Sequence, residues 1–160
     1  MTITDLSGRW EVCLDESKAD ALPTKYPDRI SLPDSTSNAG LGALNTEMEY
    51  ACLTDLHKFE GFAWFRREVE IRPEMSGKNL TLFLERTRKT RVYIDGNQIG
   101  EYCSLCTPHR YDLTGLPAGK HELIIRVDNT DYPTGGGHLT SRDTQTNWNG
   151  IVGRIELQSY

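Results

Sequence analysis

The residues best suited to chemistry lie in one polar loop near the end of the chain, between His138 and Asn149. Trp148 offers a flat apolar ring, and its neighbours offer hydrogen-bond donors and acceptors. These neighbours are Asp143, Gln145, Asn147 and Asn149. A loop of this composition, ending on a buried strand, is how a rigid scaffold presents a ligand-binding surface. The alternative is a solvated loop whose tryptophan only closes the end of the core.

A buried strand is predicted directly after this loop, because apolar and polar residues alternate over 151–157. One face carries Ile151, Ile155 and Leu157, and the other carries Val152, Arg154 and Glu156. The three glycines at 135–137 allow the backbone to turn into the loop.

Short alternating segments fill most of the remaining chain and predict further strands. They are residues 7–14, 29–32, 62–71, 79–85, 91–94, 98–101, 111–114 and 121–128. Asp95-Gly96-Asn97 separates two of them and is a strong hairpin signal. Residues 15–27 are predicted to form a loop, and residues 35–58 an ordered excursion with at most one helical turn.

About eight strands without a periodic helix predict an all-β sandwich, here of the jelly-roll type with antiparallel strands. The inward faces of these strands predict the core. Its expected members are Trp10, Phe65, Leu82, Ile94, Ile125 and Ile155. With 160 residues the chain has the length of one domain, residues 1–160.

Charge and hydropathy exclude two classes of partner. The net charge is −5, and the only basic cluster, Arg86–Arg91, lies between two predicted strands, where we interpret it as a solvated turn. We therefore expect no nucleic-acid partner. No apolar run approaches the roughly 20 residues that cross a bilayer, so no membrane partner is expected either. The first residues lack the basic and apolar regions of a signal peptide, which favours a cytoplasmic over a secreted protein.

Four cysteines are present, of which Cys103 and Cys106 have the spacing of half a zinc site. No second pair completes that site, and Thr107-Pro108 prevents the helix start that a redox motif requires. We expect reduced, structural thiols and no metal or other cofactor. A weaker candidate for calcium is the oxygen-rich cluster Asp128, Asn129 and Asp131, although a turn with Asx hydrogen bonds is the favoured interpretation.

Six short motifs follow one another along the chain. They are Leu6–Trp10, Leu32–Ser35 with Asn38–Gly42, Gly61–Arg67, Val92–Asn97, Tyr111–Thr114 and Trp148–Leu157. In this order they resemble the N-terminal sugar-binding domain of glycoside hydrolase family 2, the beta-galactosidase and beta-glucuronidase family. The resemblance implies a galactose-binding-like jelly roll. It also implies a longer parent chain with an immunoglobulin-like domain and a catalytic barrel.

The family's catalytic glutamates belong to the barrel, so the resemblance implies no catalytic residue in this chain and no autonomous hydrolysis. It also implies that the stretch before Trp148 helps to hold the sugar. Asp143 and Asn147 are the nearest candidates, and His138 and Arg142 are alternatives. The register stays open because Trp148 lies closer to Gly150 than in the large beta-galactosidases.

We therefore expect a non-catalytic carbohydrate-binding domain that helps to shape the sugar site of a family 2 exo-glycosidase. Its expected partners are carbohydrate and the immunoglobulin-like and barrel domains of the same chain. The alternatives are a free-standing lectin-like module and a purely structural interaction sandwich. An exposed Trp148 would favour sugar binding, and a fully packed Trp148 would favour the interaction sandwich. Replacing Asp143 or Asn147 by alanine is expected to lower turnover without changing the melting temperature.

Overall fold

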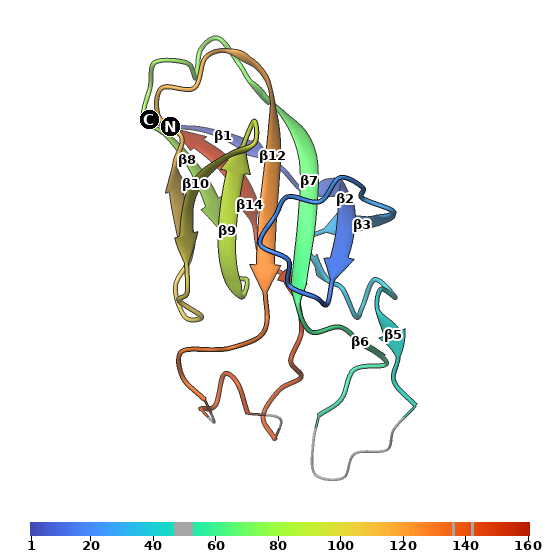
Figure 1. Cartoon of the computed structure of the whole chain (residues 1–160). Helices are drawn as coiled ribbons and strands as arrows, with labels where there is room; N and C mark the ends of the chain where they lie inside the picture. Colours follow the sequence, from blue (N-terminus) through green and yellow to red (C-terminus); the bar gives the residue numbers. More distant parts are fainter. Residues whose placement is uncertain (47–52, 136, 142) are drawn as a thin grey trace.

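The computed structural model describes residues 1–46, 53–135, 137–141 and 143–160. Within them the chain forms two antiparallel sheets that pack face to face on one hydrophobic core (Figure 1). The predicted all-β jelly-roll sandwich is therefore confirmed. No helix that could span a membrane occurs among the described residues.

The larger sheet has six strands in the order β10-β9-β12-β7-β2-β3. Its strands are β2 (Gly8–Asp15), β3 (Asp28–Leu32), β7 (Phe62–Ile71), β9 (Lys89–Ile94), β10 (Asn97–Tyr102) and β12 (Gly119–Asp128). The smaller sheet has the order β1-β14-β8-β11. Its strands are β1 (Thr2–Asp5), β8 (Leu80–Leu84), β11 (His109–Asp112) and β14 (Ile155–Ser159). Two ribbons pair β4 (Asp34–Ser35) with β13 (Gly150–Ile151) and β5 (Ala43–Leu44) with β6 (His57–Lys58).

The core lies between the two sheets, and all six residues predicted for it are at most 3% exposed. Their burial could be predicted because every second side chain of a strand points to the same face of the sheet. β7 begins and ends at the predicted residues, and β12 begins two residues earlier than expected. β1 was not predicted, since its one large apolar side chain, Ile3, is 45% exposed.

The prediction of one continuous strand over residues 151–157 was wrong. The chain leaves the strand at Val152 and re-enters at Ile155, because two backbone amides in between find other partners. The amide of Val152 donates to the carbonyl of Arg86 (3.0 Å), and the amide of Arg154 donates to the carboxylate of Glu85 (2.9 Å). Ile151 consequently pairs with β4, while Ile155 belongs to the smaller sheet.

The predicted hairpin joins β9 and β10 through a tight turn. Asp95 and Gly96 have φ angles of 49° and 79°, the left-handed values that a two-residue type I′ turn requires at both central positions. The Asp95 carboxylate accepts hydrogen bonds from the amide of Glu122 (2.8 Å) and from Nδ1 of His121 (2.6 Å). The turn is thus fastened to the start of β12.

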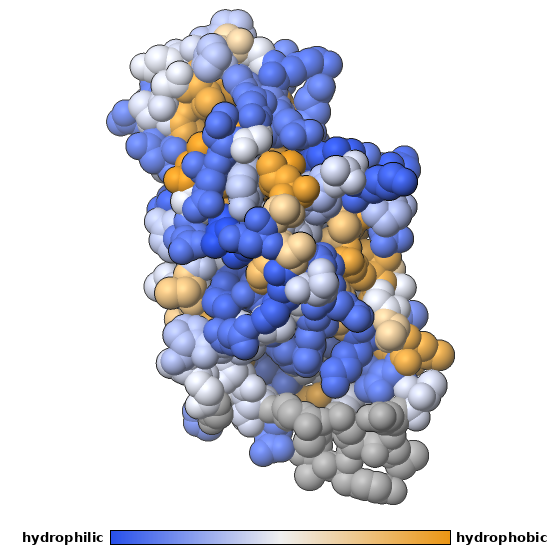
Figure 2. Space-filling view, in the orientation of Figure 1, coloured by the Kyte–Doolittle hydropathy of each residue, from blue (hydrophilic) through white to orange (hydrophobic). Residues whose placement is uncertain are grey.

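A second, smaller apolar cluster lies on the outer face of the larger sheet. Tyr26, Phe62, Trp64 and Ile124 are buried there, although Phe62 and Trp64 are on the solvent-directed face of β7. The predicted loop 15–27 covers them, and Figure 1 shows this segment passing in front of β7 and β12. Elsewhere the visible surface is mainly hydrophilic, and its apolar side chains form separate patches (Figure 2).

The excursion over residues 35–58 contains the turn that the sequence predicted. The carbonyl of Ser35 accepts the amide of Ala39 (3.1 Å), which closes a single turn. The short ribbon of β5 and β6 was not predicted, because two-residue strands carry no periodic signal. The part of the excursion over residues 47–52 lies outside the described residues.

Ile125→Ala should lower the free energy of unfolding by about 2–5 kcal/mol, because Ile125 is fully buried in the core and alanine leaves a cavity. Ile99→Ala is the matched control on β10, where the side chain is 37% exposed, and should cost under about 1 kcal/mol. Urea unfolding measures both. Equal costs for the two variants would contradict the assigned inward face of β12.

The pair of His121 and Asp95 should make stability depend on pH. The hydrogen bond to Asp95 raises the pKa of His121 above 6.5, so its stabilisation is complete below pH 6.5 and is lost as pH rises through the raised value. The same bond lowers the pKa of Asp95 below 3.8, so the pair persists at pH 4.5. The Tm difference between wild type and His121→Gln, measured from pH 4.5 to 8.5, should be largest in the acidic half. A constant difference would contradict the coupling.

Candidate functional site

The segment that the sequence marked as chemically rich lies at one end of the sandwich. Residues 130–149, which we call the terminal loop, connect β12 to β13 and are described except for positions 136 and 142. Both chain termini lie at the opposite end (Figure 1). The terminal loop is thus clear of the chain ends and rests on the ends of β7 and β12.

Two buried asparagines hold the base of the terminal loop. Asn129 accepts the amide of Gly61 (3.0 Å) and donates to the carbonyls of Phe59 (2.8 Å) and Asn147 (2.9 Å). Asn149 donates to the carbonyl of Val127 (3.0 Å). Both side chains are 0% exposed, so they satisfy backbone groups at the point where the strand ladder ends. The expectation that Asn149 faces a ligand was therefore wrong.

A buried arginine organises the rest of the terminal loop. Arg88 is 3% exposed and donates three hydrogen bonds to loop carbonyls: Nε to Trp148 (3.1 Å), Nη1 to Leu139 (3.2 Å) and Nη2 to Thr146 (3.2 Å). Its guanidinium also lies 4.1 Å from the centre of the Trp148 ring and 5.6 Å from that of Tyr132. We call this set of contacts the Arg88 clamp.

The interpretation of Arg86–Arg91 as a solvated turn was wrong. Thr87 and Arg88 are buried, and Lys89 and Arg91 belong to β9. Burial lowers the pKa of Arg88, but the ordinary pKa of an arginine is so high that the side chain stays charged. Among the described residues no carboxylate bonds to it, so carbonyl dipoles and aromatic faces stabilise the charge.

The predicted site residues fall into two groups. His138 and Asp143 are exposed, and only their backbones make hydrogen bonds among the described residues, to Thr144 and Ser141. The carboxylate of Asp143 therefore projects from the terminal loop without a partner in the described structure. Arg142 lies outside the described residues.

Asn147 and Trp148 are instead held in place. Oδ1 of Asn147 accepts the hydroxyl of Tyr132 (2.7 Å), and Nδ2 donates to the carbonyl of Asn129 (2.9 Å) and to the carboxylate of Glu60 (3.2 Å). Trp148 is partly buried, and the Arg88 guanidinium covers one face of its ring. It is neither a bare platform nor a fully packed side chain.

The space beside these residues is a shallow hollow of about 50 Å³. Its lining includes Asn147, Thr146, Glu60 and Lys58. Pockets that enclose a drug-sized ligand measure about 300–1,000 Å³, so this hollow alone is too small to enclose one. A ligand bound here would keep most of its surface in solvent unless another surface faced the terminal loop.

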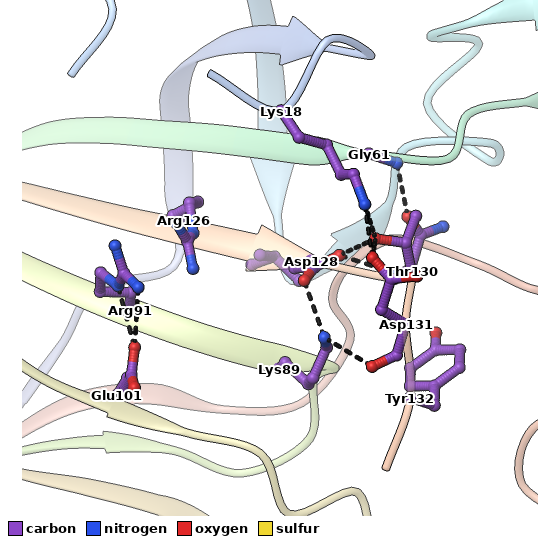
Figure 3. Close-up of polar contacts among 12 residues, drawn as sticks. Lys18, Gly61, Lys89, Arg91, Glu101, Arg126, Asp128, Thr130, Asp131 and Tyr132 are labelled. Carbon is purple, nitrogen blue, oxygen red and sulfur yellow. Dashed lines mark hydrogen bonds and ion pairs between the residues drawn. The ribbon is translucent and has the colours of Figure 1, made fainter. Parts of the chain in front are cut away.

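The calcium candidates each engage a different partner (Figure 3). Asp128 pairs with Lys89 (2.8 Å), Asp131 pairs with Lys18, and the Asn129 side chain is directed toward Gly61. Lysine ammonium groups therefore balance the two carboxylates. Asp128 also accepts the amide of residue 130 (2.8 Å), which confirms the predicted Asx turn. Among the described residues no three His, Cys, Asp or Glu side chains converge as metal ligands.

The cysteine loop between β10 and β11 exposes its two thiols. Cys103 and Cys106 are free thiols in this loop, as expected, and both are exposed to solvent. Nearby, His109 is buried, and burial lowers its pKa. It bonds to Thr90 through Nδ1 (2.6 Å) and to the carbonyl of Ser104 through Nε2 (2.7 Å). These contacts fix the end of the cysteine loop.

Sequence reasoning missed Arg88, Tyr132 and the structural role of both asparagines. Arg86 and Arg88 lie two residues apart in the same polar stretch, yet Arg86 is exposed and Arg88 is buried. No periodic signal separates the two, because neither belongs to an alternating apolar segment.

Solved structures with a similar fold are found in glycosidases. No family profile and no curated protein matches the sequence. A beta-glucuronidase from an uncultured Clostridium sp. has a TM-score of 0.75 and 20% identity over 99% of this chain and 29% of its own. A Bacteroides uniformis beta-glucuronidase 2 has a TM-score of 0.70 and 20% identity over 99% of this chain and 18% of its own.

A beta-D-mannosidase from Dictyoglomus thermophilum has a TM-score of 0.67 and 16% identity, covering 100% of this chain and 23% of its own. At such identities the likeness establishes the fold, which agrees with the fold that the sequence resemblance implied. This chain spans less than a third of each of these three structures.

Arg88→Ala should lower the free energy of unfolding by about 2–4 kcal/mol, because three buried carbonyls lose a charged donor. It should also speed amide hydrogen exchange in the terminal loop well before the core exchanges. Arg86→Ala is the matched control, since that side chain is exposed, and should change stability by less than about 0.5 kcal/mol. Unchanged loop exchange in Arg88→Ala would refute the clamp.

Proposed function

We propose that this chain is a non-catalytic carbohydrate-binding domain of a beta-glycosidase, and that its terminal loop forms one wall of the sugar site. The observation that carries the proposal is the terminal loop held by Arg88, which presents an Asp143 carboxylate that has no partner among the described residues at the open end of the sandwich. The fold likeness to segments of beta-glucuronidases and a beta-mannosidase supports it.

Sugar hydroxyls donate hydrogen bonds, and an ionised carboxylate is the strongest hydrogen-bond acceptor among protein side chains. Asp143 can therefore bind a hydroxyl of a terminal sugar, while the exposed part of Trp148 packs against ring C–H groups. The Arg88 clamp and the buried asparagines keep these groups in place before ligand arrives, which reduces the ordering cost of binding. Arg88 and Asn147 act in this proposal as positioning residues.

The shallow hollow supports a role shared with another surface. An open wall buries little of a ligand, so the affinity of the isolated chain should be millimolar, about −4 kcal/mol. The matched structures are more than three times longer than this chain, which supports a second wall from elsewhere in the same parent protein. Glycosidases use a pair of carboxyl groups about 5–9.5 Å apart, depending on mechanism. In this proposal the pair belongs to the rest of the parent protein.

A second candidate is a purely structural interaction sandwich. The observation that favours it is the Arg88 guanidinium, which occupies one face of the Trp148 ring and leaves less aromatic surface for a sugar. Under this alternative the exposed polar residues of the terminal loop would contact protein rather than carbohydrate.

Asp143→Ala, in the parent protein with all its domains, should lower kcat/KM for an aryl beta-glycoside about tenfold or more, because one charge-assisted hydrogen bond is lost. Its Tm should stay unchanged, since the carboxylate supports no other group in the described structure.

Asn147→Ala should lower both kcat/KM and Tm, because this side chain bonds to three residues. The earlier expectation of an unchanged Tm for Asn147→Ala is corrected accordingly.

The control is Glu70→Ala, an exposed acid near the far end of β7. Wild-type kinetics in Asp143→Ala, with turnover intact in the control, would favour the interaction sandwich over the sugar wall.

A further inference from the structure

The cysteine loop, residues 103–108 between β10 and β11, carries two thiols that are open to solvent. Cys103 and Cys106 are both free and exposed, and only two residues separate them. The loop lies at the same end of the sandwich as the terminal loop (Figure 1). Two neighbouring exposed thiols can be oxidised together to one disulfide within the chain, which a single thiol cannot.

The path of the cysteine loop suits such a bond. The chain bends at residues 105–107, and the hydroxyls of Ser104 and Thr107 are 2.8 Å apart. The ring of Tyr102 stacks on that of His109 (4.9 Å between centres), and Nε2 of His109 bonds to the carbonyl of Ser104 (2.7 Å), so both ends are fixed. A disulfide joins Cα atoms about 4.4–6.8 Å apart, a range that positions three apart reach across a turn.

Only one of the two thiols opens onto a groove. The groove has a volume of about 540 Å³ and lies between the cysteine loop and the terminal loop. Cys106 lines it together with Leu105, Leu139 and Val152, whereas Cys103 is not among its lining residues. Its volume is within the range of about 300–1,000 Å³ that is common for small-molecule sites. A small molecule held there would therefore meet Cys106 and not Cys103.

The charge of the groove favours one kind of small molecule. Arg86 lines the groove, and its exposed guanidinium has no hydrogen-bond or ion-pair partner among the described residues. Glu85, the acid in the lining, is already engaged by the guanidinium of Arg154 (3.1 Å) and by the backbone amide of Arg154 (2.9 Å). The groove thus combines a thiol with an uncompensated positive charge, which favours a reagent that carries a carboxylate.

We propose that Cys106 and Cys103 form a thiol–disulfide exchange site for small disulfides that carry carboxylates. The thiolate of Cys106 attacks one sulfur of the reagent, so a mixed disulfide forms and the first reagent thiolate leaves. The thiolate of Cys103 then attacks Sγ of Cys106, so the bond between the two cysteines forms and the second reagent thiolate leaves. The two thiol protons of the chain end on the two released thiols, and the chain loses two electrons to the reagent.

The pair differs from the active-site cysteines of thioredoxin-like enzymes. It is followed by β11 and not by a helix, so it lacks the helix N-terminus that activates the attacking thiol in those enzymes. We therefore expect each chain to be oxidised once, without turnover. The site is independent of the proposed function, because Asp143, Asn147 and Trp148 are not among the lining residues of the groove.

The experiment treats the reduced whole chain with glutathione disulfide, blocks the remaining free thiols and measures tryptic peptides by mass spectrometry. Residues 92–110 form one tryptic peptide, which contains Cys103 and Cys106 and no other cysteine. In the wild type this peptide should lose two hydrogens and keep no glutathione. The reason is that the second step is intramolecular, at an effective thiol concentration of about millimolar or more. In Cys103→Ser the same peptide should keep one glutathione.

Two matched comparisons test the groove. Cys106→Ser should gain glutathione about twofold to fivefold more slowly than Cys103→Ser, because Cys103 does not line the groove beside Arg86. In the Cys103→Ser background, Arg86→Gln should slow the reaction with glutathione disulfide by a similar factor. It should leave the rate with the uncharged hydroxyethyl disulfide unchanged. All three side chains are exposed, so the reduced variants should keep the wild-type urea midpoint, which checks their fold.

Each part of the proposal has its own contrary result. An unreacted peptide 92–110 overturns the whole site, and a wild-type peptide that keeps glutathione overturns the role of Cys103. Equal rates in Cys103→Ser and Cys106→Ser overturn the assignment of Cys106 to the groove. An Arg86→Gln effect that is absent, or equal for the two reagents, overturns the selection of carboxylates.

Discussion

The burial of one positive charge governs the end of this sandwich. The Arg88 guanidinium lies inside the protein, where an unsatisfied charge would cost several kcal/mol. Its hydrogen bonds are accepted by three carbonyls of the terminal loop rather than by an acid. The charge is therefore accommodated only while the loop keeps one path. The conformation of the loop and the stability of the fold are therefore coupled through Arg88.

The amide side chains of two asparagines hold the base of the same loop. Where β7 and β12 end, Asn129 and Asn149 take over the hydrogen bonding of backbone groups that have no neighbouring strand. The base of the loop is therefore bonded to the strand ends although its path is irregular. A loop anchored in this way can project polar side chains toward solvent from a defined position.

Much of the fold could be predicted from the sequence, because strand alternation and turn chemistry are local. β7, the Asp95-Gly96 turn and the six core residues are each specified by neighbours within a few positions. The break after Ile151 could not be predicted, since it depends on Glu85 and Arg86, more than sixty residues away. Burial of Arg88 is equally non-local. The candidate loop was found from its composition, but which of its polar residues face inward depends on contacts that no local pattern records.

The pairing of β1 with β14 brings the two ends of the chain together, with Thr2 opposite Ser159. Paired strands lie about 5 Å apart, so a linker of a few residues would close the chain into a ring. New ends could then be opened at the exposed residues 19–21, between β2 and β3, without interrupting a paired strand. For the same reason the whole sandwich can be carried as an insertion in a surface loop of an unrelated protein. It would enter and leave its host at one point, with the terminal loop facing away from the junction.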